Sequence, residues 1–203
     1  MVRFRGRSKH KVKLPGKPIP EGYKLWISAY QGGYICNWLM HSNELGPERI
    51  GQKARKFSQG LDSVPVMLAP TQQVPVTLCQ ELRQYNPHTK YVVYIDNLFL
   101  NVPLIHVLLQ LNIGCTGTTR KNATGILGAL CDIKELNQAM EYGGIVGQLA
   151  GNALCFAWQD NNVVLVATTA HSIHKPSDFI TVTRKRPGKS STNATIARPV
   201  FKG

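Results

Sequence analysis

Apolar and polar positions along the first 41 residues predict short strands joined by turns. Two strand-like runs, 23–30 (YKLWISAY) and 34–41 (YICNWLMH), are separated by Gln-Gly-Gly, a hairpin signal because glycine adopts the positive φ of tight turns. Basic residues occupy alternate positions in the segment before these runs, as they would on one face of a third strand. Residues 1–41 are therefore expected to form a three-stranded antiparallel start to the fold.

The middle of the chain alternates between helical and strand-like patterns. Apolar residues follow helical spacing over 74–85, with Pro75 suited to the first turn, and β-branched and aromatic residues dominate 91–96. An almost wholly apolar helix is expected over 101–113, followed by a short strand over 113–120. A strand, a helix and a strand of this length predict a right-handed parallel crossover, and hence an α/β fold with a mixed sheet.

The last third of the chain has more strand character. Residues 125–140 could hold one short helix, whereas residues 148–171 contain two strands joined by Asp-Asn-Asn, which suits a tight hairpin turn. After residue 184 the chain is polar and basic, so this tail is expected to be extended or disordered.

Composition adds an expected partner to this picture. The 203 residues are 43% hydrophobic, enough for a core, and 24 Lys and Arg against 11 Asp and Glu give a formal net charge of +13. Clustered cations attract phosphates and release condensed counterions on binding, so nucleic acid is the first expected partner and an anionic membrane surface the second. No stretch reaches the roughly 18 apolar residues of a membrane span or resembles a signal peptide, so the chain is expected to be soluble and not secreted.

The basic residues concentrate in the N-terminal segment and in the tail. In one extended N-terminal strand, the alternating cations would all project from the same face. Such a face is either a solvated edge whose charges deter pairing, or a surface that follows phosphates or acts in nuclear import. The candidate nucleic-acid contacts are Arg3, Arg5, Arg7, Lys9, Lys11, Lys13, Arg184, Lys185 and Arg186.

Asp96 is the acid with the most informative position, because it directly follows the strand-like run 91–95. Its carboxylate either caps the helix that begins near residue 99 or binds a metal at the carboxyl end of a core strand. The local pattern leaves both open. Two-metal phosphoryl chemistry requires several carboxylates around Mg²⁺. Other acids fall in loops or on helix faces, as do Glu44, Glu48, Asp62, Glu81 and Asp132.

Other reactive side chains predict structure rather than catalysis. His171 and His174 lack further ligands nearby in sequence, so a chance pair is favoured over a zinc site, and His106 is expected to be a hydrogen-bonded core residue. The five cysteines lie far apart with no C-x-x-C pair and are expected to be buried free thiols. The tryptophans are expected to be core or half-buried residues rather than base-stacking platforms: Trp26, Trp38 and Trp158.

Three blocks in this order resemble the piggyBac family of DDE transposases, in the form found in transposable element-derived proteins. They are FRGRSKHKVKLPGKPIPEGYKLW, YVVYIDNLFLNVPLIHVLLQLNIGCTGTTRKN and LCFAWQDNNVVLVATTAH. The resemblance extends from Val2 to about Phe201 and implies an α/β, RNase H-like mixed sheet with a mostly β insertion in the second half. The implied parts are a partial transposase core over 1–120, the β-rich insertion over 121–183 and the basic tail over 184–203.

The same resemblance makes Asp96 the second carboxylate of the DDE catalytic set and a Mg²⁺ ligand. In the family, the other acids lie before the segment matched at Met1 and after the segment matched near Gly203, so the chain is expected to be incomplete at both ends. Leu98, Leu100 and Asn101 stand where the family tends to have an aromatic residue and Thr-Ser. One carboxylate is insufficient for a two-metal centre.

The expected function is therefore that of a truncated, catalytically inactive transposase core with residual DNA binding. No cofactor is expected in this chain, although the intact family uses Mg²⁺. The resemblance also implies a homodimer and a nuclear, or otherwise cytoplasmic, location without membrane attachment. Two alternatives stay open: a domesticated DNA- or protein-binding module, and a fragment of an active DDE transposase that performs Mg²⁺-dependent DNA strand cleavage and transfer.

Overall fold

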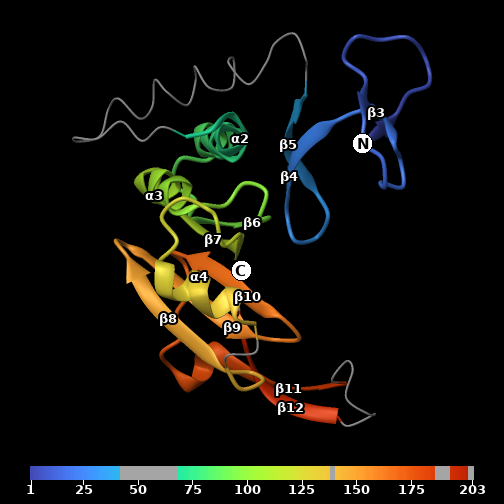
Figure 1. The fold of residues 1–203 in the computed structure, drawn as a ribbon. Coiled ribbons are helices and arrows are strands. Elements are labelled where there is room, and N and C mark those ends of the chain that lie inside the picture. The colour runs from blue at the N-terminus through green and yellow to red at the C-terminus, as the bar shows by residue number, and fades with distance from the viewer. Residues whose placement is uncertain (42–67, 138–139, 186–192, 201–203) are drawn as a thin grey trace. The chain divides into compact units, whose positions relative to one another are not determined.

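A computed structural model describes residues 1–41, 68–137, 140–185 and 193–200 of the chain. The chain divides into two compact units, residues 1–89 and 90–203, which Figure 1 draws from blue to green and from green to red. Within the described ranges no helix has the length and apolar character needed to cross a membrane.

The first unit begins with a small antiparallel sheet in the order β1-β3-β2, formed by β1 (Val2–Arg3), β2 (Val12–Lys13) and β3 (Glu21–Tyr23). The prediction of one long basic strand is wrong, because a loop separates β1 from β2, and the two strands run in the same direction on either side of β3. Ser8 starts a turn in this loop: its Oγ accepts the His10 N–H at 3.3 Å, and its carbonyl accepts the Lys11 N–H at 3.3 Å. The alternating cations therefore do not share one strand face.

A separate hairpin follows, formed by β4 (Leu25–Ala29) and β5 (Ile35–Met40). Its turn is closed by the Gly33 N–H, which donates to the Tyr30 carbonyl at 2.8 Å, and Gly33 has a φ of 86°. The predicted hairpin is thus confirmed. The predicted three-stranded sheet is wrong, because the hairpin forms its own two-stranded sheet and does not pair with the basic segment.

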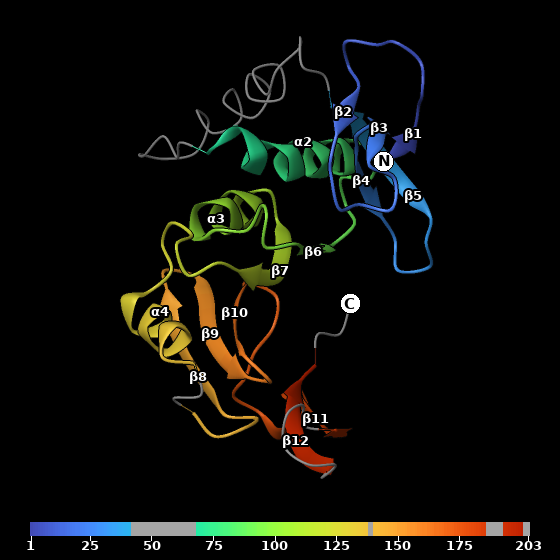
Figure 2. The same cartoon turned by 45° about the vertical axis from the view of Figure 1, so that its right-hand side comes forward.

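Helix α2 (Pro70–Tyr85) packs against this hairpin. The Asn37 side-chain amide of β5 donates to the Leu78 carbonyl at 2.9 Å and to Glu81 Oε2 at 3.1 Å, which joins one face of the hairpin to the helix. The helix begins at Pro70 rather than at residue 74, so Pro75 lies inside it and not in its first turn. Figure 2 shows α2 beside β4 and β5 within this unit.

The second unit is built on a five-stranded mixed sheet in the order β6-β7-β10-β9-β8. β6 (Tyr91–Ile95) and β7 (Ile113–Thr119) are parallel and are connected by α3 (Val102–Gln110). This confirms the predicted strand, helix and strand, the parallel pairing and the mixed α/β class. Gly117 is required in β7, because a Cβ there would overlap the Ile95 carbonyl of β6.

The antiparallel part of the sheet contains β8 (Ile145–Ala150), β9 (Ala153–Gln159) and β10 (Val163–Thr168). β9 and β10 are the predicted hairpin, and β8 starts three residues before the range expected to hold strands. Helix α4 (Gly128–Glu135) lies over β9 and β10 (Figure 1). The buried core comes from α3 and the central strands and includes Leu104, Ile105, Leu108, Ile113, Phe156, Val163 and Leu165.

His106 and the segment after residue 184 can also be compared with the predictions for the second unit. His106 Nε2 of α3 lies 3.2 Å from the Ala150 carbonyl, so the prediction of a hydrogen-bonded histidine is confirmed, at a half-buried position. The tail after residue 184 was expected to be extended or disordered, and its described part is extended and paired. A short 3-10 helix, η1 (Pro176–Asp178), leads into β11 (Phe179–Lys185), and β12 (Asn193–Pro199) pairs with β11 in a register that the local sequence could not show.

Candidate functional site at the carboxyl end of β6

Asp96 is exposed at the point where β6 ends. Its Oδ1 accepts the Asn97 N–H at 2.7 Å, and its carbonyl accepts the N–H groups of Phe99 at 3.0 Å and Leu100 at 3.3 Å. The chain thereby turns tightly between the strand and α3, and it leaves the carboxylate at the surface of the carboxyl end of the sheet. This is the kind of position at which open α/β sheets collect functional groups.

The interpretation of Asp96 as the cap of α3 is wrong. The helix begins at Val102, and Asn101 is its N-cap: Asn101 Oδ1 accepts the Leu104 N–H at 2.9 Å. The turn after β6 occupies the residues between Asp96 and the helix, so the residue that caps the helix is Asn101 and not Asp96. The carboxylate of Asp96 therefore has no role at the start of the helix.

Tyr94 lies on β6, two residues before Asp96, which directly follows the strand. Tyr94 Oη lies 3.0 Å from His171 Nε2, and the two rings stack with centroids 5.8 Å apart and an interplanar angle of 29°. Burial raises the pKa of Tyr94. Burial also lowers the pKa of His171, and the charge of Asp178 partly offsets that effect.

A hydrogen-bonded turn places His171 at this position. Thr168 Oγ1 at the end of β10 accepts the N–H groups of Ala170 at 3.0 Å and His171 at 3.1 Å, and it lies 2.6 Å from the Thr116 hydroxyl of β7. Both threonines are almost fully buried. This arrangement was not predicted from the sequence. A threonine whose hydroxyl accepts the N–H groups two and three residues later is nevertheless a known turn motif. The partner, Tyr94, lies 77 residues away and has no such signal.

The neighbouring strand, β7, carries further exposed polar groups near its carboxyl end. Ile95 pairs with Gly117 in the parallel register. Asp96 then leaves the sheet, whereas Thr118 stays in β7 and pairs with Val166 of β10. Thr118 is exposed, and so is Arg120, which directly follows β7. The strand next to β6 thus carries an exposed hydroxyl and is followed by an exposed guanidinium.

The DDE resemblance implies Mg²⁺ ions beside Asp96, and these ions would need further oxygen ligands. Mg²⁺ prefers several oxygen ligands, and two-metal chemistry needs several carboxylates in one place. Among the described residues, no group of three or more His, Cys, Asp and Glu could hold a metal ion, which also leaves His171 and His174 without a zinc set. Glu44, Glu48 and Asp62 lie outside the described residues. Asp96 and its described neighbours do not by themselves fit a two-metal centre.

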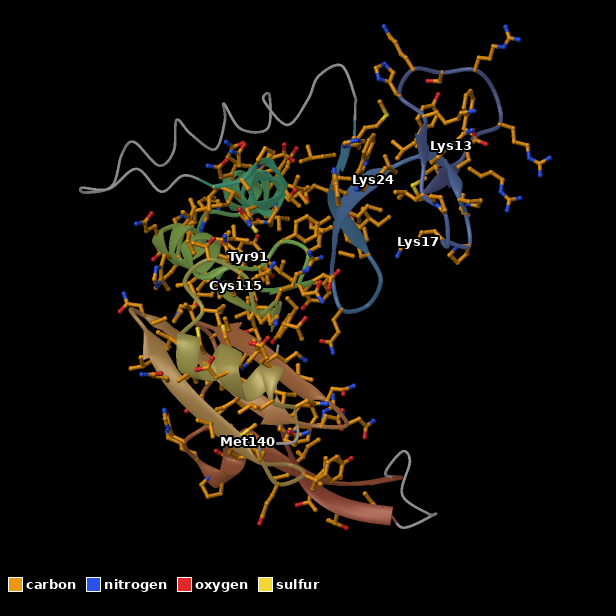
Figure 3. The ribbon with its side chains drawn as sticks, viewed as in Figure 1. Lys13, Lys17, Lys24, Tyr91, Cys115 and Met140 are labelled. Atoms are coloured by element: carbon orange, nitrogen blue, oxygen red, sulfur yellow. The ribbon has the colours of Figure 1, made fainter. Side chains whose placement is uncertain are left out.

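The N-terminal cations form a second candidate site, the basic sheet, in the first unit. Arg3, Arg5, Arg7, Lys9 and Lys13 are exposed, and so is Lys17. Figure 3 shows Lys13 and Lys17 on this small sheet and its loops, with nitrogen-tipped side chains pointing outward. Lys11 differs from the others: it is half-buried and pairs with Glu21 at 2.6 Å, and this hydrogen bond lowers the pKa of Glu21.

The tail candidates are less defined. Arg184 and Lys185 belong to β11, where they pair with Ala194 and Asn193 of β12. Arg186 lies outside the described residues. The two former residues thus belong to the extended, paired part of the tail.

Expectations for the cysteines and tryptophans hold in part. Cys79, Cys115 and Cys155 are buried free thiols, and burial raises the pKa of Cys79 to about 12 and that of Cys155 to about 11. The expectation is wrong for Cys36, which is exposed, and for Trp38, which is 55% exposed. Both lie on β5, which packs against α2 through residues that alternate with them, such as Asn37.

Comparisons with known proteins agree with this architecture. The model of the family described as Transposase IS4 matches residues 1–198. Human PiggyBac transposable element-derived protein 3 is 29% identical over 177 residues, which cover 86% of this chain and 26% of that protein. Human PiggyBac transposable element-derived protein 2 is 25% identical over 202 residues, which cover 98% of this chain and 30% of that protein. The chain thus spans between a quarter and a third of the length of these relatives.

A solved structure shows the same fold. The cryo-EM structure of a piggyBac transposase synaptic complex with hairpin DNA matches with a TM-score of 0.60 at 17% identity, and the match covers 85% of this chain and 32% of that one. The family match, the two relatives and this fold agree with the resemblance seen in the sequence. The chain therefore belongs to the DDE transposase family described as Transposase IS4, among its piggyBac-type members.

Proposed function

We propose that this chain is a transposase-derived core that binds DNA through its basic sheet and does not, by itself, cleave or join DNA strands. The observation that carries the proposal is the exposed set of cations on that sheet, whose one acid, Glu21, is paired with Lys11. Phosphates are the natural partners of such a surface, because cations that contact them release condensed counterions. The fold neighbour that was solved with hairpin DNA supports DNA as the polyanion.

The finer parts of the proposal concern fold and assembly. We propose an RNase H-like core that includes β6, α3 and β7, with a mostly β insertion that contributes β8, β9 and β10. The parallel β6–β7 pair connected by a helix supports this arrangement. We also propose a homodimer and a nuclear location, both of which rest on the piggyBac resemblance. Light scattering of the purified chain tests the first, and imaging of the tagged protein in cells tests the second.

Asp96 has a restricted role in this proposal. With further carboxylates, Mg²⁺ would stabilise charge on the attacking and leaving oxygens of a phosphodiester, and Asp96 would supply one oxygen ligand. One exposed carboxylate cannot hold such a centre alone, so we propose that the chain lacks strand-cleavage activity on its own. A second candidate function, as part of an active DDE transposase, is favoured by one observation: Asp96 is exposed at the strand end and is not used as a helix cap.

Salt-dependent binding tests the proposed function. The affinity of the chain for a labelled duplex should fall steeply between low and physiological salt, with a slope of about −0.9 per phosphate contacted. A chain that does not bind at low salt would refute the DNA-binding part. A domesticated protein-binding module would instead show no salt-dependent affinity for DNA and would require a protein partner.

A further inference from the structure

Ser8 lies in the loop between β1 and β2, among the exposed cations of the basic sheet. It is the single serine or threonine in the first 27 residues, and none of the first 20 residues is acidic. Cations stand five, three and one residues before it and one and three residues after it: Arg3, Arg5, Arg7, Lys9 and Lys11. The proposed function gives this hydroxyl no role.

We propose that Ser8 is a phosphorylation site for protein kinases that select cations around the acceptor serine, and that its phosphate weakens DNA binding by the basic sheet. The proposal rests on the proposed DNA binding and adds a means of regulating it. In the reaction, the Ser8 Oγ forms a bond to the γ-phosphorus of ATP, the bond from that phosphorus to the β-phosphate oxygen breaks, and ADP leaves. The hydroxyl proton passes to the catalytic base of the kinase.

The Ser8 hydroxyl is available for this reaction. Its Oγ accepts the His10 N–H at 3.3 Å, and among the described residues the hydroxyl has no acceptor for its own proton. Ser8 is half-buried, but Gly6, Arg7 and Lys9 on either side of it are exposed. A kinase can therefore contact the cations that flank the serine before the hydroxyl itself is drawn outward.

The hydrogen bonds that shape the loop at Ser8 are long. The Lys11 N–H donates to the Ser8 carbonyl at 3.3 Å, and Lys11 Nζ donates to the Gly6 carbonyl at 3.2 Å. These distances are at or beyond the upper end of the usual range for N–H to oxygen hydrogen bonds. The loop also lies between strands and not within a ladder, so its local opening costs little free energy. Such a segment can be extended in the substrate cleft of a kinase.

A phosphate on Ser8 would act on the cations that the proposed function assigns to DNA. Arg7 and Lys9 are its direct neighbours, with Cα atoms about 3.8 Å from that of Ser8. Phosphoserine carries a charge of about −1.5 to −2 near pH 7 and has three acceptor oxygens. It would therefore offset about two cations and offer their N–H groups an acceptor within the chain in place of a DNA phosphate.

Ser172 in the second unit provides a matched comparison. Its Oγ accepts the N–H of His174, two residues later, at 3.2 Å, and it is also half-buried, so the local turn resembles that at Ser8. It differs because the ten residues before it contain no lysine or arginine, and because its side chain also hydrogen-bonds to Asp178. A kinase that selects cations should therefore modify Ser8 and not Ser172.

The modification is tested on the purified folded chain. The chain is incubated with ATP and a purified kinase that selects arginine three and five residues before the acceptor, and mass spectrometry of fragments locates the phosphate. Ser8 should be phosphorylated and Ser172 should not, and an acid-directed kinase should leave Ser8 unmodified. Ser58 also follows cations at these spacings and lies outside the described residues, so Ser8→Ala is needed to assign any effect to Ser8.

Fluorescence anisotropy with a labelled duplex tests the effect on binding. Kinase treatment should weaken binding by the wild-type chain and by Ser172→Ala about tenfold, and should reduce the slope of log affinity against log salt by about 2. It should leave Ser8→Ala unchanged. Ser8→Asp and Ser8→Asn separate charge from shape, because both side chains can accept the same backbone N–H. Without treatment, Ser8→Asp should bind about threefold more weakly than Ser8→Asn.

The outcomes that contradict the proposal are distinct from failure of the proposed function. A folded chain that takes up no phosphate at Ser8 would refute the modification site. A chain phosphorylated at Ser8 that binds the duplex as tightly as the untreated chain would refute the regulation, and so would equal affinities for Ser8→Asp and Ser8→Asn. These results leave DNA binding intact. An untreated wild-type chain that does not bind at low salt would refute the proposed function and the regulation together.

Discussion

The basic sheet of the first unit and the β6 edge of the second unit hold their polar side chains in different ways. In the basic sheet, strands of two or three residues and their loops carry exposed cations, and Lys11 forms an ion pair with Glu21 at 2.6 Å. At the β6 edge, buried threonines and a stacked Tyr94–His171 pair fix the side chains in a five-stranded sheet. The first region has many exposed charges on short strands, and the second has hydrogen-bonded side chains and few charges.

This difference indicates a division of roles. Exposed cations contribute affinity that depends on salt and is insensitive to sequence, because the phosphate backbone is uniform. Groups held by a buried network contribute to the stability of the fold, because a buried donor or acceptor that loses its partner is costly. Substitutions in the two regions should therefore have different consequences for folding and for binding.

The largest effect is expected from the packing of α3 against the five-stranded sheet. Leu104 of α3 is fully buried, so Leu104→Ala should lower the free energy of unfolding by about 3 kcal/mol. Leu98→Ala is the matched control, since Leu98 is 41% exposed, and it should change stability by about 0.5 kcal/mol or less. Urea unfolding followed by circular dichroism measures both. Equal effects for the two variants would show that the edge does not depend on this core.

A smaller loss of stability is expected from the hydroxyl network. Thr168→Val keeps the shape of the side chain but leaves the N–H groups of Ala170 and His171 and the Thr116 hydroxyl without this partner. The free energy of unfolding should fall by about 2 kcal/mol. The same urea experiment checks this value, with Thr118→Val as the exposed control. An unchanged stability would mean that the turn after β10 is held by other contacts.

In the basic sheet, substitution should affect binding and not folding. Arg5→Ala removes an exposed cation, so it should change stability by about 0.5 kcal/mol or less and should reduce the slope of log affinity against log salt by about 1. Lys121→Ala makes the same change in net charge at a lysine that pairs with Glu135 at 2.9 Å, and it should leave the slope unchanged. Equal slopes for Arg5→Ala and Lys121→Ala would mean that DNA affinity depends on the net charge of the chain and not on the basic sheet.

The smallest effect concerns pH. Burial lowers the pKa of His171 in the folded chain below its unfolded value, so the folded state disfavours protonation of the ring. This contribution to stability is fully present above the unfolded pKa, near 6.5, and decreases as the pH falls below it. His171→Gln should flatten the pH dependence of the melting temperature between about pH 7 and pH 5, and His174→Gln should not. A flat wild-type profile over this range would argue against a buried, neutral imidazole.

Elements set by local patterns could be predicted from the sequence. Glycine in the turn before Tyr34 indicated the β4–β5 hairpin. The apolar residues of 102–110 indicated α3, and the β-branched run 91–95 indicated β6. The mixed α/β class and the family followed from the order of these segments, and the family match and fold comparison confirm the family.

Features that depend on contacts between distant residues could not be predicted in this way. The basic segment is interrupted by a turn at Ser8, and Lys11 pairs across the small sheet with Glu21, so its alternation does not describe a single strand. β12 exists because it pairs with β11, although its composition is typical of a disordered tail. The Tyr94–His171 contact joins residues 77 positions apart, and only the folded sheet brings them together.

One assay tests the central claim of DNA binding without cleavage most directly. The purified chain is incubated with labelled piggyBac-type transposon ends in Mg²⁺ or Mn²⁺, and both the bound complex and the DNA products are resolved for the wild-type chain and for Asp96→Asn. The account predicts salt-sensitive complexes and intact DNA with both proteins. Nicked or joined products with the wild-type chain that disappear with Asp96→Asn would contradict it.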